Sequence, residues 1–241
     1  MAYHVWSGPR EVGHGFIWVG HRGAASLAPA NTASSFEAAL ALGVDLVEVD
    51  LRRTADGVLV LAHDACIKAS GGRELEVAAS ALEELQRVDL GQGECVPTLR
   101  DAIRQVLGRA GLMIDLKLEG AEEQLVDEVR AEGLRQVIVP GGTPFSRERL
   151  RSLDPGLPIS LSLDLAEQPL VTAATLAQTD VDAFTLHHRL VTPELVRAAH
   201  DSGRLAFAWT VDDAERMLEL LDMGVDGLIS NRPQVFAGLH R

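Results

Sequence analysis

Three short apolar runs carry pairs of ionisable side chains two positions apart or at their ends. Residues two apart on a β-strand point to the same side of a sheet. If these runs are strands, each therefore presents its polar side chains together. The side chains are His21 and Arg22 directly after FIWVG, Glu48 and Asp50 in LVEVDLR, and Asp115 and Lys117 in LMIDLKL.

The acidic members of this set favour a metal ion. Carboxylates that face one another repel unless they share a proton or bind a cation. Glu48, Asp50 and Asp115 offer only oxygen ligands, which suits a hard divalent ion such as Mg²⁺ or Ca²⁺. Zinc more often binds His or Cys, and the sequence has no His-x-x-x-His or Cys-x-x-Cys pair. We therefore expect a divalent metal cofactor, Mg²⁺ or Ca²⁺.

The basic and aromatic members favour phosphate chemistry. Arg22 can hold phosphate oxygens through its forked guanidinium, and Lys117 adds a second cation. His21 and His63, the latter in VLVLAHD, suit a general acid and base pair because imidazole titrates near neutral pH. Trp209 in AWTV is a candidate for the substrate pocket. The whole set predicts cleavage of a phosphate ester, in which one histidine activates the nucleophile and the other protonates the leaving oxygen.

The elements that must position these residues alternate between β-rich runs and amphipathic segments. Several of the segments, such as TLRDAIRQVLGRAG and DAERMLELLDMG, end in glycine, as helices often do. Eight such units with right-handed crossovers predict an α/β protein with one domain over 1–241, a (β/α)₈ TIM barrel whose active site lies at the carboxyl ends of the strands. The predicted strands are Phe16–Gly20, Leu46–Arg52, Leu112–Leu118, Gln136–Pro140, Pro158–Leu163, Ala183–His187, Leu205–Val211 and Gly227–Ser230.

Residues 58–97 interrupt this alternation. TADG predicts a turn and VLVLAHD a short strand, and no further strand-and-helix unit follows until TLRDAI. We expect a small insertion after the second barrel strand, on the side of the barrel that carries the loops. It either shapes a substrate pocket or only covers one end of the barrel.

The overall charge limits the choice of partners. Asp and Glu number 35 against 22 Lys and Arg, a formal net charge of −13, which opposes nucleic acid and anionic membranes. We expect a small-molecule substrate, no nucleic acid and no stable membrane association. The two cysteines, Cys66 and Cys95, have no metal-ligand spacing, and no run in the sequence resembles a secretory signal or a membrane span. These features predict a cytoplasmic location.

Taken singly, these residues have ordinary structural explanations. A histidine at a strand end is often only a hydrogen-bonding residue, and Asp115 with Lys117 can form a buried ion pair. Trp209 can belong to the core. His187 and His188 follow one another at the end of the sixth predicted strand, so they are expected to point to opposite sides, and neither is included among the catalytic candidates. Only the combination of residues indicates an active site.

The order of the motifs resembles that of one protein family. GHRG, PANT and LVEVDLRRTADGVLVLAHD are followed by VPTLRDAI, LMIDLKL and AWTVDDAERMLELLDMGVDGLISNRP. From about Val19 to Pro233 this order resembles the glycerophosphodiester phosphodiesterase family. The resemblance implies a barrel enzyme that hydrolyses glycerophosphodiesters to an alcohol and glycerol 3-phosphate with Ca²⁺ or Mg²⁺. It also implies the roles of His21 and His63 as the catalytic pair, of Glu48, Asp50 and Asp115 as metal ligands, and of Arg22 and Lys117 as phosphate contacts.

Two positions depart from the family pattern. Asp115 stands where the family usually has Glu, and its side chain is shorter by one methylene, which leaves the metal preference open. Ala30 stands where the family has the Glu of Pro-Glu-Asn-Thr, and Asn31 and Thr32 are expected to cap the following helix. The head group of the substrate, the choice of acid and base between the histidines, direct water attack or a cyclic phosphate, and the oligomeric state are also open.

Two other functions compete with this interpretation. One is a different phosphodiesterase on the same barrel, of lysophospholipase D or phospholipase C type. Such enzymes act at a lipid interface, which the aromatic content of 4% and the negative net charge oppose. The other is a catalytically silent barrel that binds a metal ion or phosphate.

Overall fold

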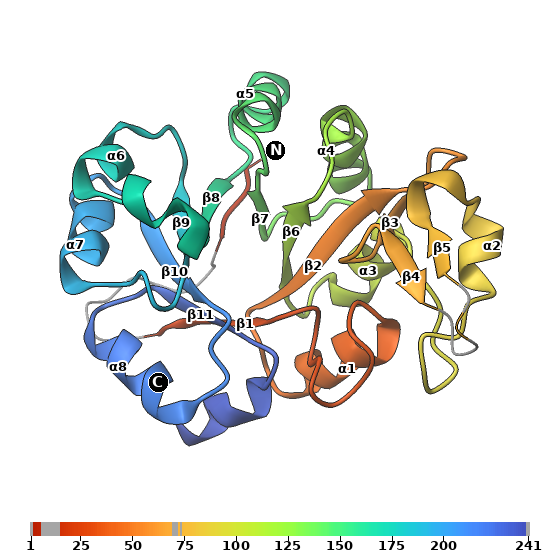
Figure 1. The fold of residues 1–241 in the computed structure, drawn as a ribbon, viewed down its shortest axis with the longest axis horizontal. Helices are drawn as coiled ribbons and strands as arrows, with labels where there is room; N and C mark the ends of the chain where they lie inside the picture. The colour runs from red at the N-terminus through yellow and green to blue at the C-terminus, as the bar shows by residue number, and fades with distance from the viewer. Residues whose placement is uncertain (1, 6–14, 69–71, 73, 240–241) are drawn as a thin grey trace.

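Eight parallel strands close into a barrel, with helices around the outside, in a computed structural model of the chain (Figure 1). The structure describes residues 2–5, 15–68, 72 and 74–239. Each strand pairs with its neighbours, and β1 pairs with both β2 and β11, which closes the sheet. The predicted (β/α)₈ barrel is confirmed. Its strands are β1 (Ile17–Gly20), β2 (Leu46–Arg53), β6 (Gly111–Leu116), β7 (Val137–Pro140), β8 (Ile159–Leu163), β9 (Ala183–His187), β10 (Leu205–Trp209) and β11 (Gly227–Ser230).

The outer helices begin where the loops from the strand ends turn back along the barrel. Most of them follow a Thr or Asp whose side chain accepts a backbone N–H, as Thr32 does from Ser35 and Asp213 does from Arg216. None of the described helices is both long enough and apolar enough to cross a membrane. They are α1 (Ala33–Ala41), α3 (Leu99–Val106), α4 (Glu122–Ala131), α5 (Pro144–Leu153), α6 (Ala173–Gln178), α7 (Pro193–Asp201) and α8 (Ala214–Asp222), with the 3₁₀ helices η2 (Leu165–Leu170) and η3 (Pro233–Gly238).

Alternation along the strands separates two apolar layers. Outward side chains such as Val47, Val49 and Ile114 pack with the helices in the larger core. Inward side chains such as Leu46 and Met113 form a second cluster inside the barrel. The same inward faces continue toward the carboxyl ends of β2 and β6 with polar residues. The barrel interior is therefore apolar at one end and polar at the end where the loops lead into the helices.

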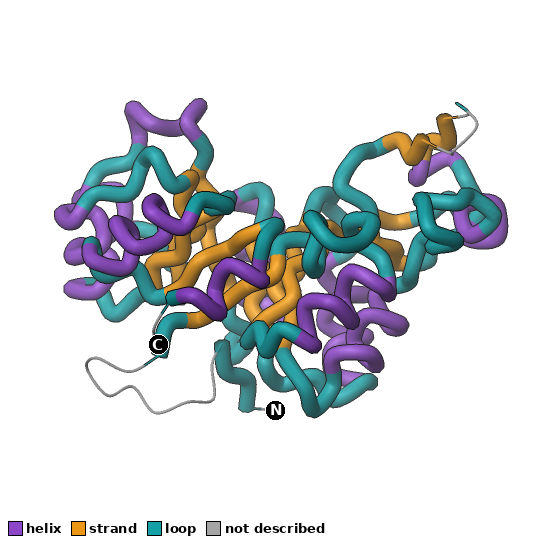
Figure 2. Tube along the Cα trace, turned by 90° about the horizontal axis from the view of Figure 1, so that it is seen from below, coloured by secondary structure: helices purple, strands orange, loops and turns teal. Residues whose placement is uncertain are grey.

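The described residues between 58 and 97 form an excursion beside the barrel, which extends to one side in Figure 2. Its first strand pairs antiparallel with β2, and its buried side chains, which include Val60, Ile67 and Leu85, form a separate hydrophobic cluster. The excursion contains β3 (Leu59–Leu61), β4 (Cys66–Lys68), β5 (Glu74–Glu76), η1 (Val77–Ala79) and α2 (Leu82–Gln86).

Candidate active site

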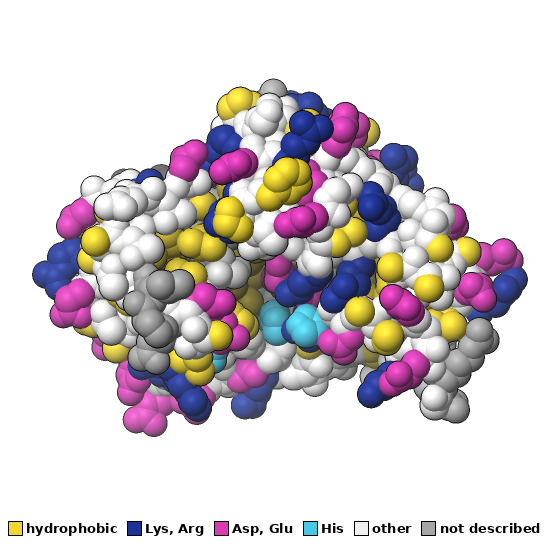
Figure 3. Space-filling model, turned by 45° about the horizontal axis from the view of Figure 1, so that its top comes forward, with side chains coloured by type: hydrophobic (Ala, Val, Ile, Leu, Met, Phe, Trp, Pro, Cys, Tyr) yellow, Lys and Arg dark blue, Asp and Glu magenta, His cyan; other side chains and the backbone are white. Residues whose placement is uncertain are grey.

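A cavity of about 640 Å³ lies at the carboxyl ends of the barrel strands. In the space-filling view, histidine, acidic and basic side chains gather at a hollow near the centre of this face (Figure 3). The cavity wall includes every site residue predicted from the sequence: His21, Arg22, Glu48, Asp50, His63, Asp115, Lys117 and Trp209. Of the described residues between 58 and 97, only His63 lines it, so the rest of the excursion lies outside the pocket.

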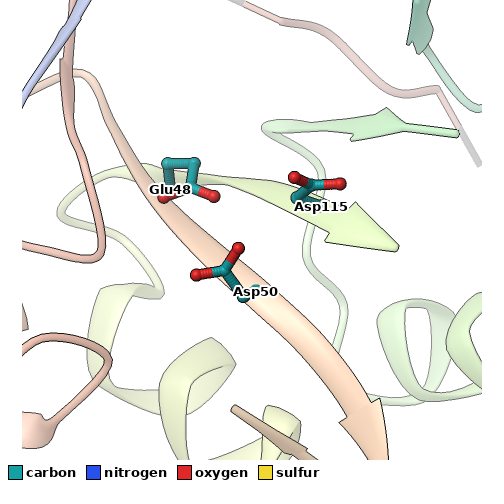
Figure 4. A group of neighbouring side chains, drawn as sticks. All are labelled: Glu48, Asp50 and Asp115. Carbon is teal, nitrogen blue, oxygen red and sulfur yellow. The ribbon is translucent and has the colours of Figure 1, made fainter. Parts of the chain in front are cut away.

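Three carboxylates converge on one point inside this cavity. Glu48 and Asp50 lie on β2, and Asp115 lies opposite Asp50 on the neighbouring β6 (Figure 4). One oxygen from each of the three lies within 4.8 Å of the others. Glu48 and Asp50 are buried and Asp115 is half-buried. This arrangement is close enough for one small cation to contact all three.

The electrostatics of the cluster show an excess of negative charge. Burial raises the pKa of Glu48 well above its usual value, and the charges of Asp50 and Asp115 raise it further. Burial also raises the pKa of Asp115, against the opposing effect of Lys117. For Asp50, burial acts in the same direction, but Lys117 and Arg22 outweigh it and lower the pKa. A hard divalent cation fits this donor set because it would stabilise all three groups in their ionised form.

Two cations lie directly against the carboxylates. The Nε atom of Arg22 is 3.0 Å from Oδ2 of Asp50, and the Nζ atom of Lys117 contacts Oδ1 of Asp50 at 3.2 Å and also contacts Asp115. Burial alone would lower the pKa of Lys117, but Asp115 and Asp50 raise it, so the amine is charged. The buried Nε–H of Arg22 has no aligned hydrogen-bond acceptor among the described residues. Since this Nε is buried and lies 3.0 Å from Asp50, it faces that carboxylate, and contact with a ligand oxygen falls to the Nη groups of the same guanidinium, which lines the cavity.

The turn after β1 is shaped to bring Arg22 over the carboxylates. Arg22 adopts a left-handed conformation with φ of 52°. Its N–H donates to Oε2 of Glu48 at 2.9 Å, and its carbonyl accepts from Oγ of Ser35 at 2.8 Å. Gly23 follows with φ of 84°, and a Cβ atom there would lie 2.5 Å from the Ser35 Oγ. The His-Arg-Gly sequence thus reflects a tight turn that needs glycine next to the two polar residues.

Asn31 holds a metal-ligand candidate rather than capping a helix. Its Nδ2 donates to Oδ2 of Asp50 at 2.9 Å, and its Oδ1 accepts the backbone N–H of Asp50 at 3.3 Å. Thr32 is the N-cap of α1. The expectation that Asn31 joins Thr32 in capping was therefore wrong. Ala30 is exposed and does not line the cavity.

His21 is fixed by two linked side chains from the loops that follow the last two strands. Nδ2 of Asn231 donates to Oδ2 of Asp212 at 2.8 Å, which turns the Asn231 Oδ1 toward Nδ1 of His21 at 2.6 Å. An amide oxygen only accepts, so the neutral imidazole carries its proton on Nδ1 and a lone pair on Nε2. Burial, with a further effect of Arg22, lowers the pKa of His21 to about 4. Its 3.8 Å contact with Glu48 is therefore not an ion pair at neutral pH.

His63 has a different environment, outside the barrel strands. Its side chain is 44% exposed, and its Nδ1 lies 2.8 Å from Oδ1 of Asp64. The carboxylate of Asp64 accepts the Nδ1 proton, so Nε2 is the ring nitrogen available to the cavity. The two histidines thus share a tautomer but differ in burial and in the charge of their partners.

The indole of Trp209 closes another part of the wall. Its Nε1 donates to the Thr185 carbonyl at 3.0 Å, and His187 lies edge-on to it at 5.6 Å.

The rings of His187 and His188 stack at 4.7 Å, so the expectation that they point to opposite sides was wrong. Strand alternation does not apply because β9 ends at His187. Neither of these two histidines lines the cavity.

Sequence reasoning missed Asn231, Asp212 and Asn31. Asn231 directly follows β11, so the rule that selected His21 and Arg22 after β1 would also have selected it. Asp212 is adjacent to Asp213, the N-cap of α8, and no local pattern separates their roles. Asn31 sits in the PANT segment with φ of 57°, and its reach to Asp50 depends on how that turn folds.

The chain is similar to known phosphodiesterases over nearly its whole length. The sequence profile of the Glycerophosphoryl diester phosphodiesterase family matches residues 21–235. A glycerophosphodiester phosphodiesterase from Caldanaerobacter subterraneus subsp. tengcongensis is 30% identical, with 92% of this chain and 97% of that protein covered.

Solved structures share the same fold. A putative glycerophosphoryl diester phosphodiesterase from Silicibacter pomeroyi is 25% identical with a TM-score of 0.85, covering 94% of this chain and 95% of that one. An Oleispira antarctica phosphodiesterase, solved in complex with the product sn-glycerol-3-phosphate, is 24% identical with a TM-score of 0.82, covering 92% and 95%. The family match and the barrel together show that the chain belongs to the Glycerophosphoryl diester phosphodiesterase family.

Proposed function

We propose that the protein is a metal-dependent glycerophosphodiester phosphodiesterase that releases an alcohol and glycerol 3-phosphate. The observation that carries this proposal is one cavity that holds three convergent carboxylates, two cations and two imidazoles. Membership of the family supports the substrate class. The glycerol 3-phosphate bound to the Oleispira antarctica relative supports the product.

Glu48, Asp50 and Asp115 are the proposed metal ligands. When bound, Mg²⁺ or Ca²⁺ would supply a Lewis acid that polarises a phosphoryl oxygen. The three carboxylates exceed Arg22 and Lys117 by one negative charge. A divalent ion changes this balance to one positive charge, which complements the single negative charge of a phosphodiester.

Arg22 and Lys117 are the proposed phosphate contacts. Arg22 follows β1 and Lys117 follows β6, the two barrel strands that pair with β2, and both residues line the cavity. There, the guanidinium of Arg22 and the ammonium of Lys117 can orient the non-bridging oxygens and stabilise the charge that develops on them. Trp209 would form an apolar wall for the part of the substrate that does not react.

The environments of the histidines suggest different roles in proton transfer. His21 is neutral at pH 7 and has its lone pair on Nε2, so it is the proposed base that takes the proton from the attacking hydroxyl group. His63 is the proposed acid: in its doubly protonated form Asp64 holds the Nδ1–H, and Nε2 gives its proton to the bridging oxygen as the bond from phosphorus to that oxygen breaks. The first transfer is the same whether water or a glycerol hydroxyl attacks phosphorus.

A comparison of leaving groups tests these roles. Alkyl alcohols need a proton to leave, whereas p-nitrophenol does not. We expect His63→Ala to lower kcat strongly for glycerophosphoethanolamine and only slightly for the p-nitrophenyl ester of glycerol 3-phosphate. His21→Ala should lower kcat for both substrates. Equal losses on both substrates from His63→Ala would exclude the acid role for His63.

A second candidate is a phosphodiesterase that accepts an acylated substrate, as a lysophospholipase D does. Phe145 is 59% exposed and Leu165 is 39% exposed. They follow closely on Thr143 and Asp164, which line the cavity. Apolar side chains beside the pocket could contact an acyl chain. Turnover of lysophosphatidylcholine at a higher kcat/KM than that of glycerophosphocholine would favour this candidate, and the reverse order would favour the water-soluble diesters.

A further inference from the structure

One face of β2 extends from the metal cluster to the loop that carries His63. Glu48, Asp50 and Arg52 are alternate residues of this strand, so their side chains leave the same face. The first two belong to the carboxylate cluster. The guanidinium of Arg52 donates to the carbonyl oxygen of His63 through Nε at 3.0 Å and Nη2 at 2.7 Å.

The backbone is anchored on both sides of His63. The N–H of Ala62 donates to the Asp50 carbonyl at 3.0 Å, and the carbonyl of Ala65 accepts from the N–H of Val77 at 2.8 Å. Between these two points, the partner of the His63 ring, Asp64, is itself 80% exposed. Within the described part of the chain, no side chain other than Arg52 makes a hydrogen bond to the backbone of His63. Arg52 therefore fixes the direction of the His63 carbonyl between the two anchors.

We propose that Arg52 is a positioning residue that holds His63 at a set distance from the metal-binding carboxylates. The inference rests on the proposed function, because it takes His63 to be a proton donor. A guanidinium that bonds one oxygen through two nitrogens limits both the distance and the direction of that oxygen. β2 thus links the metal cluster to the acid: two of its side chains would hold the ion, and a third holds the loop.

Arg52 does not act as a phosphate contact in this arrangement. It does not line the cavity, and its Nε and Nη2 both donate to the His63 carbonyl. It also differs from its neighbour Arg53, which lies on the opposite face of β2 and donates to the Gly120 carbonyl at 2.8 Å. Arg53 offers a matched control, because it too links the end of β2 to a loop carbonyl.

A double-mutant cycle tests the proposal. Misplacement of a reacting group by 1 Å can cost about 100-fold in rate. We expect Arg52→Met to lower kcat about 10- to 100-fold on glycerophosphoethanolamine with KM changed less than about 3-fold. In a His63→Ala background the same substitution should have less than about a 2-fold effect. Arg52→Lys, which retains one donor, should recover part of the rate, and Arg53→Met should stay within about 3-fold of wild type.

The outcomes separate this proposal from the proposed function. If wild type turns over and His63→Ala does not, an Arg52→Met enzyme with wild-type kcat overturns the positioning role. Equal losses from Arg52→Met with and without His63 also overturn it, since the effect then does not act through His63. All four proteins of the cycle are compared on glycerophosphoethanolamine, using the residual turnover of the His63→Ala proteins. On the p-nitrophenyl ester, whose turnover does not need the acid, Arg52→Met should have little effect, and a loss of about 10-fold or more there would also overturn the proposal.

NMR spectra of His63 test the same proposal without a measurement of turnover. The ring C–H resonances of His63 in a ¹³C-labelled protein should shift or broaden in Arg52→Met and remain unchanged in Arg53→Met. Unchanged His63 resonances in Arg52→Met would overturn the proposal. A wild-type protein without turnover would contradict the proposed function, and the resonances would still show whether Arg52 holds His63.

Discussion

The amide of Asn231 selects the form of His21 that can act as a base. Its oxygen faces Nδ1 of His21 at 2.6 Å because its nitrogen is held by Asp212. Asn231→Leu removes this acceptor at similar volume. Without this acceptor, the tautomer of His21 with its proton on Nδ1 is no longer favoured. The other tautomer, with its proton on Nε2, has no lone pair toward the cavity and cannot act as the base. We expect the variant to fold and bind substrate but to lose most of its turnover.

The size of the effect follows from the lost hydrogen bond. A buried donor without a partner costs about 1–3 kcal/mol. Since 1.36 kcal/mol corresponds to a tenfold change in rate, we expect kcat to fall about 10- to 100-fold. KM should change little, because Asn231 does not line the cavity. Asn231→Asp keeps an oxygen beside Nδ1 and should therefore lose less turnover than Asn231→Leu, but it replaces the donor to Asp212 by a second carboxylate and should be less stable than wild type.

The assay is steady-state release of glycerol 3-phosphate at saturating metal, with ¹⁵N spectra of the His21 ring to report the tautomer. Thermal unfolding of both variants serves as the control for folding. A wild-type spectrum with the proton on Nε2, or an Asn231→Leu enzyme with normal kcat, would refute the reasoning.

Three further predictions concern metal affinity and stability. Asn31→Ala removes the amide that orients Asp50, so calorimetry with Mg²⁺ or Ca²⁺ should show affinity weakened about 10- to 100-fold; an unchanged Kd would argue against metal binding at Asp50. Gly23→Ala places a Cβ atom 2.5 Å from the Ser35 Oγ at φ of 84°, and urea unfolding should show a loss of about 2 kcal/mol or more; a loss below about 0.5 kcal/mol would mean that the turn adapts. Burial alone would raise the pKa of Asp154, but the hydrogen bonds from Arg130 and Tyr3 lower it. Because its folded pKa is below its unfolded pKa, its stabilising effect is complete above the unfolded value of about 3.9 and is lost as the pH falls through the folded value. Asp154→Asn should therefore be less stable than wild type by about 2 kcal/mol at pH 7, and the difference should vanish in strong acid; a difference independent of pH would contradict this.

The barrel and the main cluster could be predicted because they depend on local patterns. Alternation within a strand places Glu48 and Asp50 together, and the parallel neighbour β6 brings Asp115 beside them. Strand ends of a barrel meet at one mouth, so His21 and Lys117 follow from the same rule. These predictions need only the period of a strand and the order of the elements.

The residues that support this cluster could not be predicted in the same way. His21 and Asn231 are separated by 210 positions, and their contact depends on the closure of β1 against β11. Asn31 reaches Asp50 only because its turn adopts a left-handed conformation. Arg52 was one charged residue among several at the end of β2, and its bond to the His63 carbonyl depends on the path of the following loop. Tertiary packing decides each of these contacts.

The most direct test of the central claim is the release of glycerol 3-phosphate from glycerophosphoethanolamine, measured with Mg²⁺ or Ca²⁺ and with a chelator. The proposed function predicts turnover with at least one ion, loss of that turnover with the chelator, and its return when the ion is restored. Turnover that persists in the chelator would contradict the metal role of Glu48, Asp50 and Asp115. No turnover with either ion, from a protein shown to be folded, would contradict the proposed activity itself.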